Sequence, residues 1–141
     1  MGTTLPAAWE LSRHDSGLAI VSTLRADHTI QASLVNTGIV GDRLAFVTYG
    51  RVKLANLRAR PQVTVAFRDG WKYATVEGTA ELTGPDDPRP GVDAEALRLL
   101  LREIFAAAGG THDDWDEYDR VMREQGRTAV LVTPTRIYGS V

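Results

Sequence analysis

Two cations, Arg51 and Lys53, lie two positions apart where an apolar run gives way to a helix-like segment. The apolar run covers residues 44–47, Gly50 permits a sharp turn, and Pro61 ends the helical segment. Backbone N–H groups at the start of a helix are unpaired and the helix dipole is positive there, so this corner suits a phosphate. A solvated basic turn would have the same sequence, and the corner alone leaves both interpretations open.

The other candidates for chemistry are weaker. His14, His28 and His112 do not have the spacing of a zinc site, so we expect solvated histidines and no metal. Glu77 and Glu81 share one face of an expected strand, which indicates a charged exterior rather than a hydrolytic pair. The sequence has no nucleophile elbow, Walker loop or dinucleotide-binding fingerprint, and therefore gives no support to hydrolase, kinase or nicotinamide-Rossmann functions.

Length and composition indicate one globular domain over residues 1–141, with 43% hydrophobic and 24% charged residues. The net charge of −2 disfavours nucleic-acid binding driven by bulk electrostatics, and the absence of cysteine excludes disulfides and thiolate chemistry. No apolar run approaches the roughly 20 residues that span a bilayer, and the N-terminal residues do not resemble a signal peptide. We therefore expect a cytoplasmic protein with no membrane partner.

The elements that must position the basic corner are mostly short strands separated by turn residues. Alternation and β-branched residues predict strands over 17–24, 30–37, 39–47 (with a turn at 41–43), 63–68, 71–82, 127–133 and 137–139. Helices are expected from 51 to about 60, from 93 to about 108, and from 111–114 to 126, with a Pro-rich loop over 84–91. Gly78 is expected to mark a bulge or a close backbone approach. The pattern predicts a mainly β fold of six or seven mostly antiparallel strands, closed or split into a barrel, with peripheral helices.

Several segments, taken in order along the chain, resemble one known family. They are residues 18–24, 31–33, 51–61, 69–78, 115–118 and 136–139. The corner at 51–61 is the most specific of them, and together they cover nearly the whole chain. The chain resembles the pyridoxamine 5′-phosphate oxidase-like split β-barrel superfamily, and specifically its actinobacterial branch that binds the deazaflavin coenzyme F420.

This resemblance implies a homodimer with two cofactor sites at the subunit interface. It implies that Arg51 and Lys53 bind the cofactor phosphate, with Asn56 at the helix start as a further contact. Trp71 and Tyr73 would come from the partner subunit and help to wall the site.

The resemblance also implies which residues face the cofactor ring and its ribityl chain. They are Gln31, Ser33 and the backbone of Thr48 and Tyr49. It implies an F420-dependent oxidoreductase that transfers a hydride to or from a small organic acceptor such as a quinone, an unsaturated compound or a linear tetrapyrrole. Because the protein would mainly hold ring and acceptor face to face, no catalytic residue is predicted.

Two alternatives remain open from the sequence. FMN would place its phosphate on the same basic corner, which would make the chain an FMN-dependent oxidase or reductase. A function of another class is non-catalytic cofactor or haem binding, for which His14 or His112 would have to serve as the axial ligand.

Overall fold

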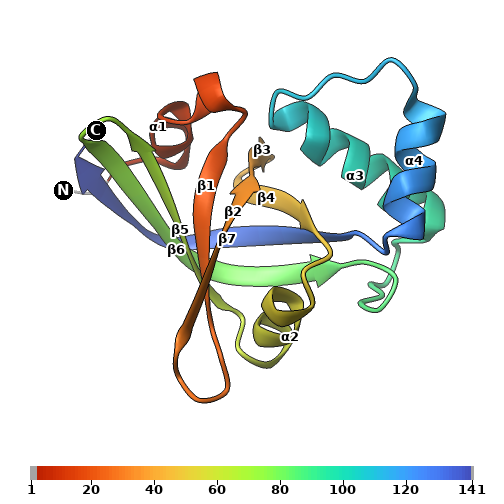
Figure 1. The fold of residues 1–141 in the computed structure, drawn as a ribbon, viewed down its shortest axis with the longest axis horizontal. Coiled ribbons are helices and arrows are strands. Elements are labelled where there is room, and N and C mark those ends of the chain that lie inside the picture. The colour runs from red at the N-terminus through yellow and green to blue at the C-terminus, as the bar shows by residue number, and fades with distance from the viewer. Residues whose placement is uncertain (1–2, 141) are drawn as a thin grey trace.

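The computed structural model describes residues 3–140, and its centre is a single antiparallel sheet in the order β2-β1-β5-β6-β7-β4-β3. The strands are β1 (Leu18–Leu24), β2 (Ile30–Asn36), β3 (Gly38–Val40), β4 (Arg43–Thr48), β5 (Gln62–Asp69), β6 (Lys72–Thr83) and β7 (Thr128–Ser140). The helices are α1 (Leu5–Glu10), α2 (Arg51–Ala59), α3 (Ala94–Ala107) and α4 (Trp115–Glu124), with a short 3₁₀ turn, η1 (Arg13–Asp15). The sheet curls into a half-barrel (Figure 1), which confirms the predicted mainly β, split-barrel fold.

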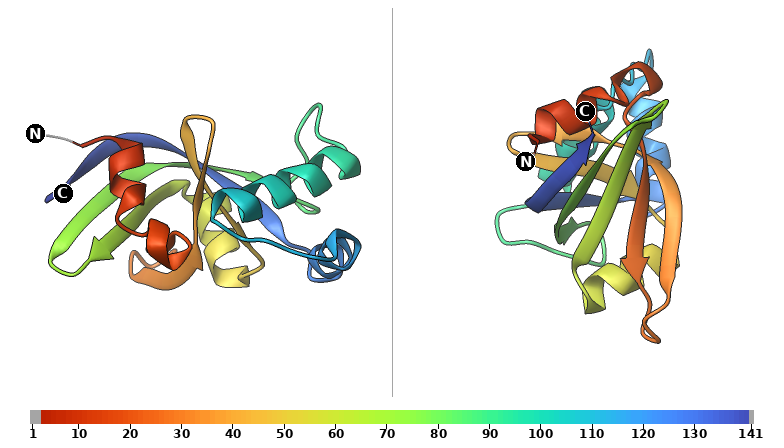
Figure 2. Two further views of the ribbon diagram at one scale, coloured as in Figure 1. Left: turned by 90° about the horizontal axis from the view of Figure 1, so that it is seen from above. Right: turned by 90° about the vertical axis from the view of Figure 1, so that its left-hand side faces the viewer.

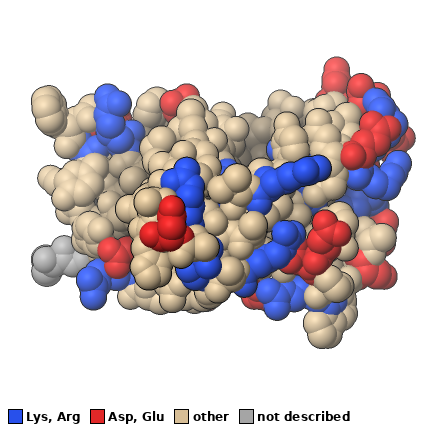
Figure 3. Space-filling model, turned by 60° about the horizontal axis from the view of Figure 1, so that its bottom comes forward, with Lys and Arg blue, Asp and Glu red and all other residues tan. Residues whose placement is uncertain are grey.

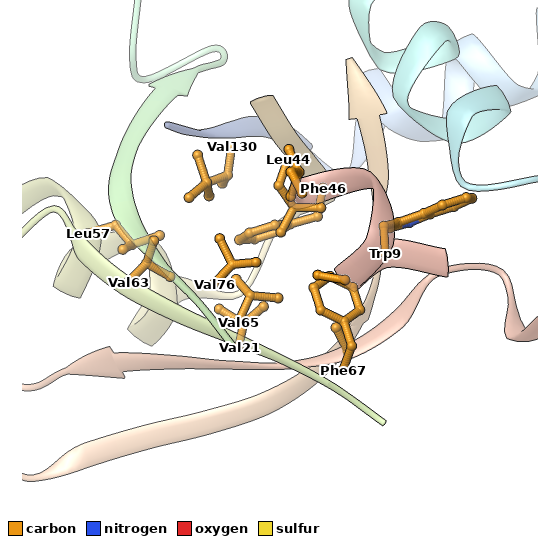
Figure 4. Packing of buried hydrophobic residues seen from close by; sticks show 14 of the residues in the cluster. Trp9, Val21, Leu44, Phe46, Leu57, Val63, Val65, Phe67, Val76 and Val130 are labelled. Carbon is orange, nitrogen blue, oxygen red and sulfur yellow. The ribbon is translucent and has the colours of Figure 1, made fainter. Parts of the chain in front are cut away.

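The main core fills the concave side of the curled sheet. Val21, Val65 and Val76 come from the three neighbouring strands β1, β5 and β6 and are fully buried, and the ring of Phe46 packs among them from β4 (Figure 4). Strands β1 and β5 alternate buried and more exposed residues because one face meets the core and the other does not. Alternation of this kind, together with β-branched residues, is the signal that predicts strands in the sequence.

A second, smaller core lies between β4, β7 and the helices α3 and α4. Ala45, Ala129 and Leu131 face Leu101 and Ile104 of α3 there. Strand β4 and the first part of β7, residues 128–132, are therefore covered on both faces, which explains why their apolar residues run almost continuously instead of alternating. Helices α3 and α4 lie together at one end of the molecule, away from α1 (Figure 2).

Strand β7 is continuous, although two segments were predicted. It pairs with β6 along its length, and the register shifts between Glu77 and Gly78, where Thr135 is the extra residue. A Cβ on Gly78 would lie 2.5 Å from the carbonyl oxygen of Thr133, so only glycine fits. The bulge and the close approach predicted at Gly78 are both confirmed, and the bulge is what lets Pro134 remain in the strand.

Helix α1 was not predicted. Its six residues are too few to show a helical period. Trp9 anchors it in the main core, and its indole Nε1 donates a hydrogen bond to the carbonyl of Thr37 at 3.0 Å. The helix packs against β3, β6 and β7 and covers part of the core that the open sheet leaves exposed.

Helices α3 and α4 both begin at an aspartate cap. Asp93 accepts a hydrogen bond from the backbone of Ala96 at 2.8 Å, as predicted. The start predicted for α4 within residues 111–114 is confirmed, since Asp114 caps the first turn and the helix begins at Trp115. Within the part of the chain that the structure describes, no helix has both the length and the apolar character needed to cross a membrane.

Candidate functional site

A cleft of about 600 Å³ opens where the end of β4 turns into α2. One wall is the end of β2 with the turn between β4 and α2, and the opposite wall comes from α3 and α4. Figure 1 shows why these elements meet: α2 and the α3–α4 pair lie on either side of the end of β4. The side chains of the helical wall are Ile104, Phe105, Tyr118 and Met122.

Lys53 is the charged group that the fold buries at this cleft. The residue is only 6% exposed, and its ammonium lies 5.9 Å from the centre of the Phe46 ring. Desolvation lowers the pKa of Lys53, and no acidic side chain of residues 3–140 offsets that cost. A largely buried cation without a counterion favours an anion as its partner.

The first turn of α2 adds to the positive potential beside Lys53. Gly50 is the N-cap and provides no side-chain acceptor for the first N–H groups of the helix. These donors and the positive end of the helix dipole favour a phosphate or carboxylate at the same corner. The chemistry derived from the sequence for this corner therefore has a structural basis.

Arg51 lies on a different side of α2. It begins the helix two positions before Lys53, which corresponds to a rotation of roughly 200° around the helix axis, and its side chain is exposed. Figure 3 views the molecule from the side of α2 and shows Lys and Arg side chains across the middle of this face. The structure thus places one of the two predicted phosphate ligands in the cleft wall and the other on the adjoining surface.

Asn56 was predicted at the helix start, but it lies in the second turn of α2 and is buried. Its Nδ2 donates to the Thr23 hydroxyl at 3.0 Å, and that hydroxyl donates to Oε1 of Gln31 at 3.2 Å. This chain of hydrogen bonds joins α2 to β1 and β2. In this structure Asn56 and Gln31 therefore fix the position of α2 relative to β2.

Ser33 has a hydroxyl for which the fold provides no partner. Among residues 3–140, its Oγ is the single buried side-chain nitrogen or oxygen without a hydrogen bond. Gln31, Ser33 and Val35 share the inward face of β2, and Val35 lines the cleft. An unpaired buried hydroxyl beside a cleft is a reason to expect a polar group of a ligand there.

Thr48 and Tyr49 form the edge of the cleft at the end of β4. The Thr48 hydroxyl accepts a hydrogen bond from the backbone N–H of Gly50 at 3.1 Å and so shapes the turn. The Tyr49 ring is covered by the guanidinium of Arg127, whose Cζ lies 3.9 Å from the ring centre. Both residues line the cleft.

Trp71 and Tyr73 lie outside the cleft of their own chain. They belong to the hairpin between β5 and β6, and Trp71 is 99% exposed. The same convex face also exposes apolar side chains at positions that lie side by side across neighbouring strands, namely Leu34, Ile20 and Tyr138. The structure therefore leaves an uncovered apolar surface on this face.

Arg127 and Tyr118 are cleft residues that sequence reasoning missed. Burial raises the pKa of Tyr118 to about 12, and its hydroxyl donates to the carbonyl of Leu101 at 3.0 Å. Burial lowers the pKa of Arg127. Tyr118 lies in the segment 115–118 that carries part of the family resemblance, but the resemblance gave it no role. Arg127 stands in no recognisable motif and meets Tyr49 only because β4 and β7 pair.

The comparisons with known proteins agree with this architecture. Residues 5–140 match the family described as pyridoxamine 5′-phosphate oxidase. A conserved hypothetical protein from Mycobacterium tuberculosis has a similar structure, with a TM-score of 0.72, 17% identity, and coverage of 98% of this chain and 84% of that one.

Two other similar structures have more informative descriptions. An F420 reductase gives a TM-score of 0.61 with 21% identity and coverage of 85% of this chain and 87% of that one. A pyridoxamine 5′-phosphate oxidase-related, FMN-binding protein from Nostoc punctiforme PCC 73102 gives 0.63 with 13% identity and coverage of 94% and 80%. At these identities the likeness shows a common fold.

Proposed function

Because the chain belongs to the pyridoxamine 5′-phosphate oxidase family, we propose that it is an oxidoreductase that binds a flavin-type cofactor in the cleft beside Lys53. The observation that carries the proposal is the largely buried Lys53 side chain, whose ammonium no acidic side chain of residues 3–140 neutralises. A cofactor phosphate supplies the missing counterion. The family and the similar structures support flavin or deazaflavin chemistry in general.

The residues of the cleft fit such a cofactor. Lys53 and the N–H groups of the first turn of α2 would hold the phosphate, with Arg51 adding positive potential from the adjoining surface. The Ser33 hydroxyl and the backbone of Thr48 and Tyr49 would contact the ring and its polar chain. When bound, the reduced cofactor supplies the hydride, and the protein contributes binding, orientation and exclusion of water.

In the finer form of the proposal the cofactor is the deazaflavin F420 and the acceptor is a small organic molecule. The sequence resemblance and the similarity to an F420 reductase support this choice. FMN is the second candidate, because the same phosphate corner would accept it and an FMN-binding protein has a similar structure. Haem binding has less support, since His14, His28 and His112 line neither this cleft nor the second cavity described below.

Titration of the purified apo-protein with F420 and with FMN, followed by fluorescence, tests the choice of cofactor. Tight binding of F420 with weak binding of FMN supports the F420-dependent enzyme, and turnover of menadione with reduced F420 then tests the reaction. The reverse preference assigns the protein to the FMN-dependent members of the family. Failure to bind either cofactor refutes the proposed oxidoreductase.

The functional form in this proposal is a homodimer that pairs the convex faces of two sheets. The exposed side chains of Ile20, Leu34, Tyr73 and Tyr138 give that face the apolar character of an interface. Trp71 would then reach from each subunit toward the cofactor site of the other. A solution mass of 15.4 kDa, that of one chain, would refute the dimer and with it the interfacial site.

A further inference from the structure

A second cavity of about 460 Å³ lies behind the helical wall of the cleft. It is enclosed by the loop that follows β6 and by α3 and α4. Tyr118, Met122 and Arg127 line both this cavity and the cleft, so the two spaces adjoin at these residues. The second cavity is large enough for a molecule with one or two aromatic rings.

Most of the wall of the second cavity is apolar. Val92, Leu97, Leu101 and Met122 contribute aliphatic and thioether surface, and Pro85 and Pro88 close the side of the loop. Such a surface binds the apolar body of a ligand and gives it little orientation. Orientation must come from the charged groups at its edge.

The acidic residues of this wall are already occupied. Asp87 accepts two hydrogen bonds from Arg58, at 2.8 and 2.7 Å. Asp119 is paired with Arg98 at 3.0 Å and with Arg102. Of the two remaining acids, Asp93 caps α3 and Glu95 pairs with Arg98. The wall therefore has no carboxylate to offer to a cationic ligand.

Unlike these carboxylates, the Arg127 side chain is not paired with a group of opposite charge in residues 3–140. Its Nε donates to the side-chain oxygen of Gln125 at 2.8 Å, and its plane lies over the Tyr49 ring, so the guanidinium is held in place. No carboxylate of residues 3–140 pairs with it, and its two terminal nitrogens make no hydrogen bond within that range. A fixed guanidinium with free terminal N–H donors is suited to bind a carboxylate or a similar planar anion.

We propose that the second cavity binds the apolar body of an acceptor molecule whose anionic group is held by Arg127 at the junction with the cleft. The acceptor class is thus an apolar, ring-containing carboxylate or a comparable organic anion. Arg127 acts as a specificity-determining residue, because the uncharged analogue would lack its ionic anchor. That the bound molecule is a hydride acceptor rests on the proposed function. Binding of its anionic group by Arg127 does not depend on a bound cofactor.

The test uses two fluorescent probes of similar shape, anilinonaphthalene sulfonate, which is an anion, and N-phenylnaphthylamine, which is neutral. Arg127→Gln should weaken binding of the anionic probe by about tenfold or more and leave the neutral probe within about twofold. Arg120→Gln is the matched control, since Arg120 pairs with Glu117 and Glu124 on the exposed side of α4. This control should bind both probes as the wild-type protein does.

Lys53→Met separates the two proposed sites. It should leave the affinity for the anionic probe unchanged, whereas the proposed function requires it to weaken cofactor binding. If Lys53→Met weakens the anionic probe and Arg127→Gln does not, the anion binds in the cleft and the inference about Arg127 is wrong. Equal loss of both probes in Arg127→Gln, or no binding of the anionic probe to the wild-type protein, also overturns it.

A measurement on the unmodified protein covers the case in which Arg127→Gln does not fold. Naphthoate should displace anilinonaphthalene sulfonate at concentrations at which naphthamide does not, because the two competitors differ in charge and not in the ring system. Equal displacement by both would show that the cavity selects only for apolar surface, and the proposed anionic acceptor would be refuted.

Discussion

Replacing Lys53 by methionine should change stability and cofactor affinity in opposite directions. Methionine has a similar length and no charge, so it keeps the contact with Phe46 and removes the partly desolvated ammonium. In the ligand-free protein that ammonium has no counterion among the described residues, and burial without a partner is unfavourable. We expect Lys53→Met to raise the free energy of unfolding by about 1 kcal/mol.

The effect on cofactor affinity is larger. A hydrogen bond between a charged donor and a phosphate contributes about 1.5–3 kcal/mol, so losing it should raise the dissociation constant roughly 10- to 150-fold. The matched control is Lys72→Met, which alters the other lysine of the chain at the exposed start of β6. That variant should leave both the stability and the affinity close to those of the wild-type protein.

The pH dependence gives an independent check of the same residue. The pKa of Lys53 in the folded protein is lower than the 10.5 of the free side chain, so the unfolded chain binds more protons between the two values. The stability of the wild-type protein therefore contains a contribution that rises with pH through this interval, and Lys53→Met should lack it. Urea unfolding over a series of alkaline pH values measures both curves.

If Lys53→Met binds F420 and FMN as tightly as the wild-type protein does, Lys53 does not bind the cofactor phosphate. If the variant is less stable than the wild-type protein in the absence of ligand, the unpaired ammonium does not destabilise the fold. Fluorescence titration and urea unfolding of the same three preparations decide between these outcomes. A gain in stability without a loss of affinity would mean that the phosphate binds elsewhere.

Three further predictions concern the interface, the helical pair and the bulge. Ile20→Glu should yield a protein of 15.4 kDa in sedimentation equilibrium and weaken cofactor binding, and a dimer of unchanged affinity would contradict the proposed interface. Asp119→Asn should lower the free energy of unfolding by about 1.5 kcal/mol at neutral pH, since it weakens the pairing with Arg102. The pKa of Asp119 is lowered by this pairing, so the difference from the wild-type protein should shrink as pH falls below 3.8, and a difference independent of pH would refute the assignment. Gly78→Ala should cost about 2 kcal/mol or more in urea unfolding because its Cβ would meet the carbonyl of Thr133, and a neutral effect would show that the bulge can relax.

The strands and the basic corner could be predicted because their signals are local. The alternation of polar and apolar residues predicted β6 nearly to its ends, and turn residues such as Gly70 marked where neighbouring strands separate. The bulge and close approach at Gly78 could be predicted because a glycine inside an alternating strand has few other structural explanations. Helix α1 was missed because its role depends on Trp9 reaching Thr37, a contact across the fold that no short window of sequence contains.

The cleft was only partly predictable for the same reason. Lys53 follows from the corner itself, whereas its separation from Arg51 follows from the rotation of α2 against the sheet. Asn56 carried the expected polar side chain, but the fold directs it to Thr23. Nothing in the sequence around Arg127 indicates its place in the cleft, since that place depends on the pairing of strands that are distant in the sequence.

The pairing of polar groups around the two cavities supports a ligand site at the cleft. The carboxylates of Asp87 and Asp119 are each held by arginine, and Asp93 caps a helix, so the fold itself satisfies these carboxylates. Lys53, a largely buried residue, and Arg127 have no counterion in residues 3–140, and the buried Ser33 hydroxyl has no hydrogen-bond partner there. Lys53 and Arg127 line the cleft, and Ser33 lies on the same face of β2 as Val35, which also lines it. Unpaired groups that gather around one cleft indicate a site shaped for a ligand.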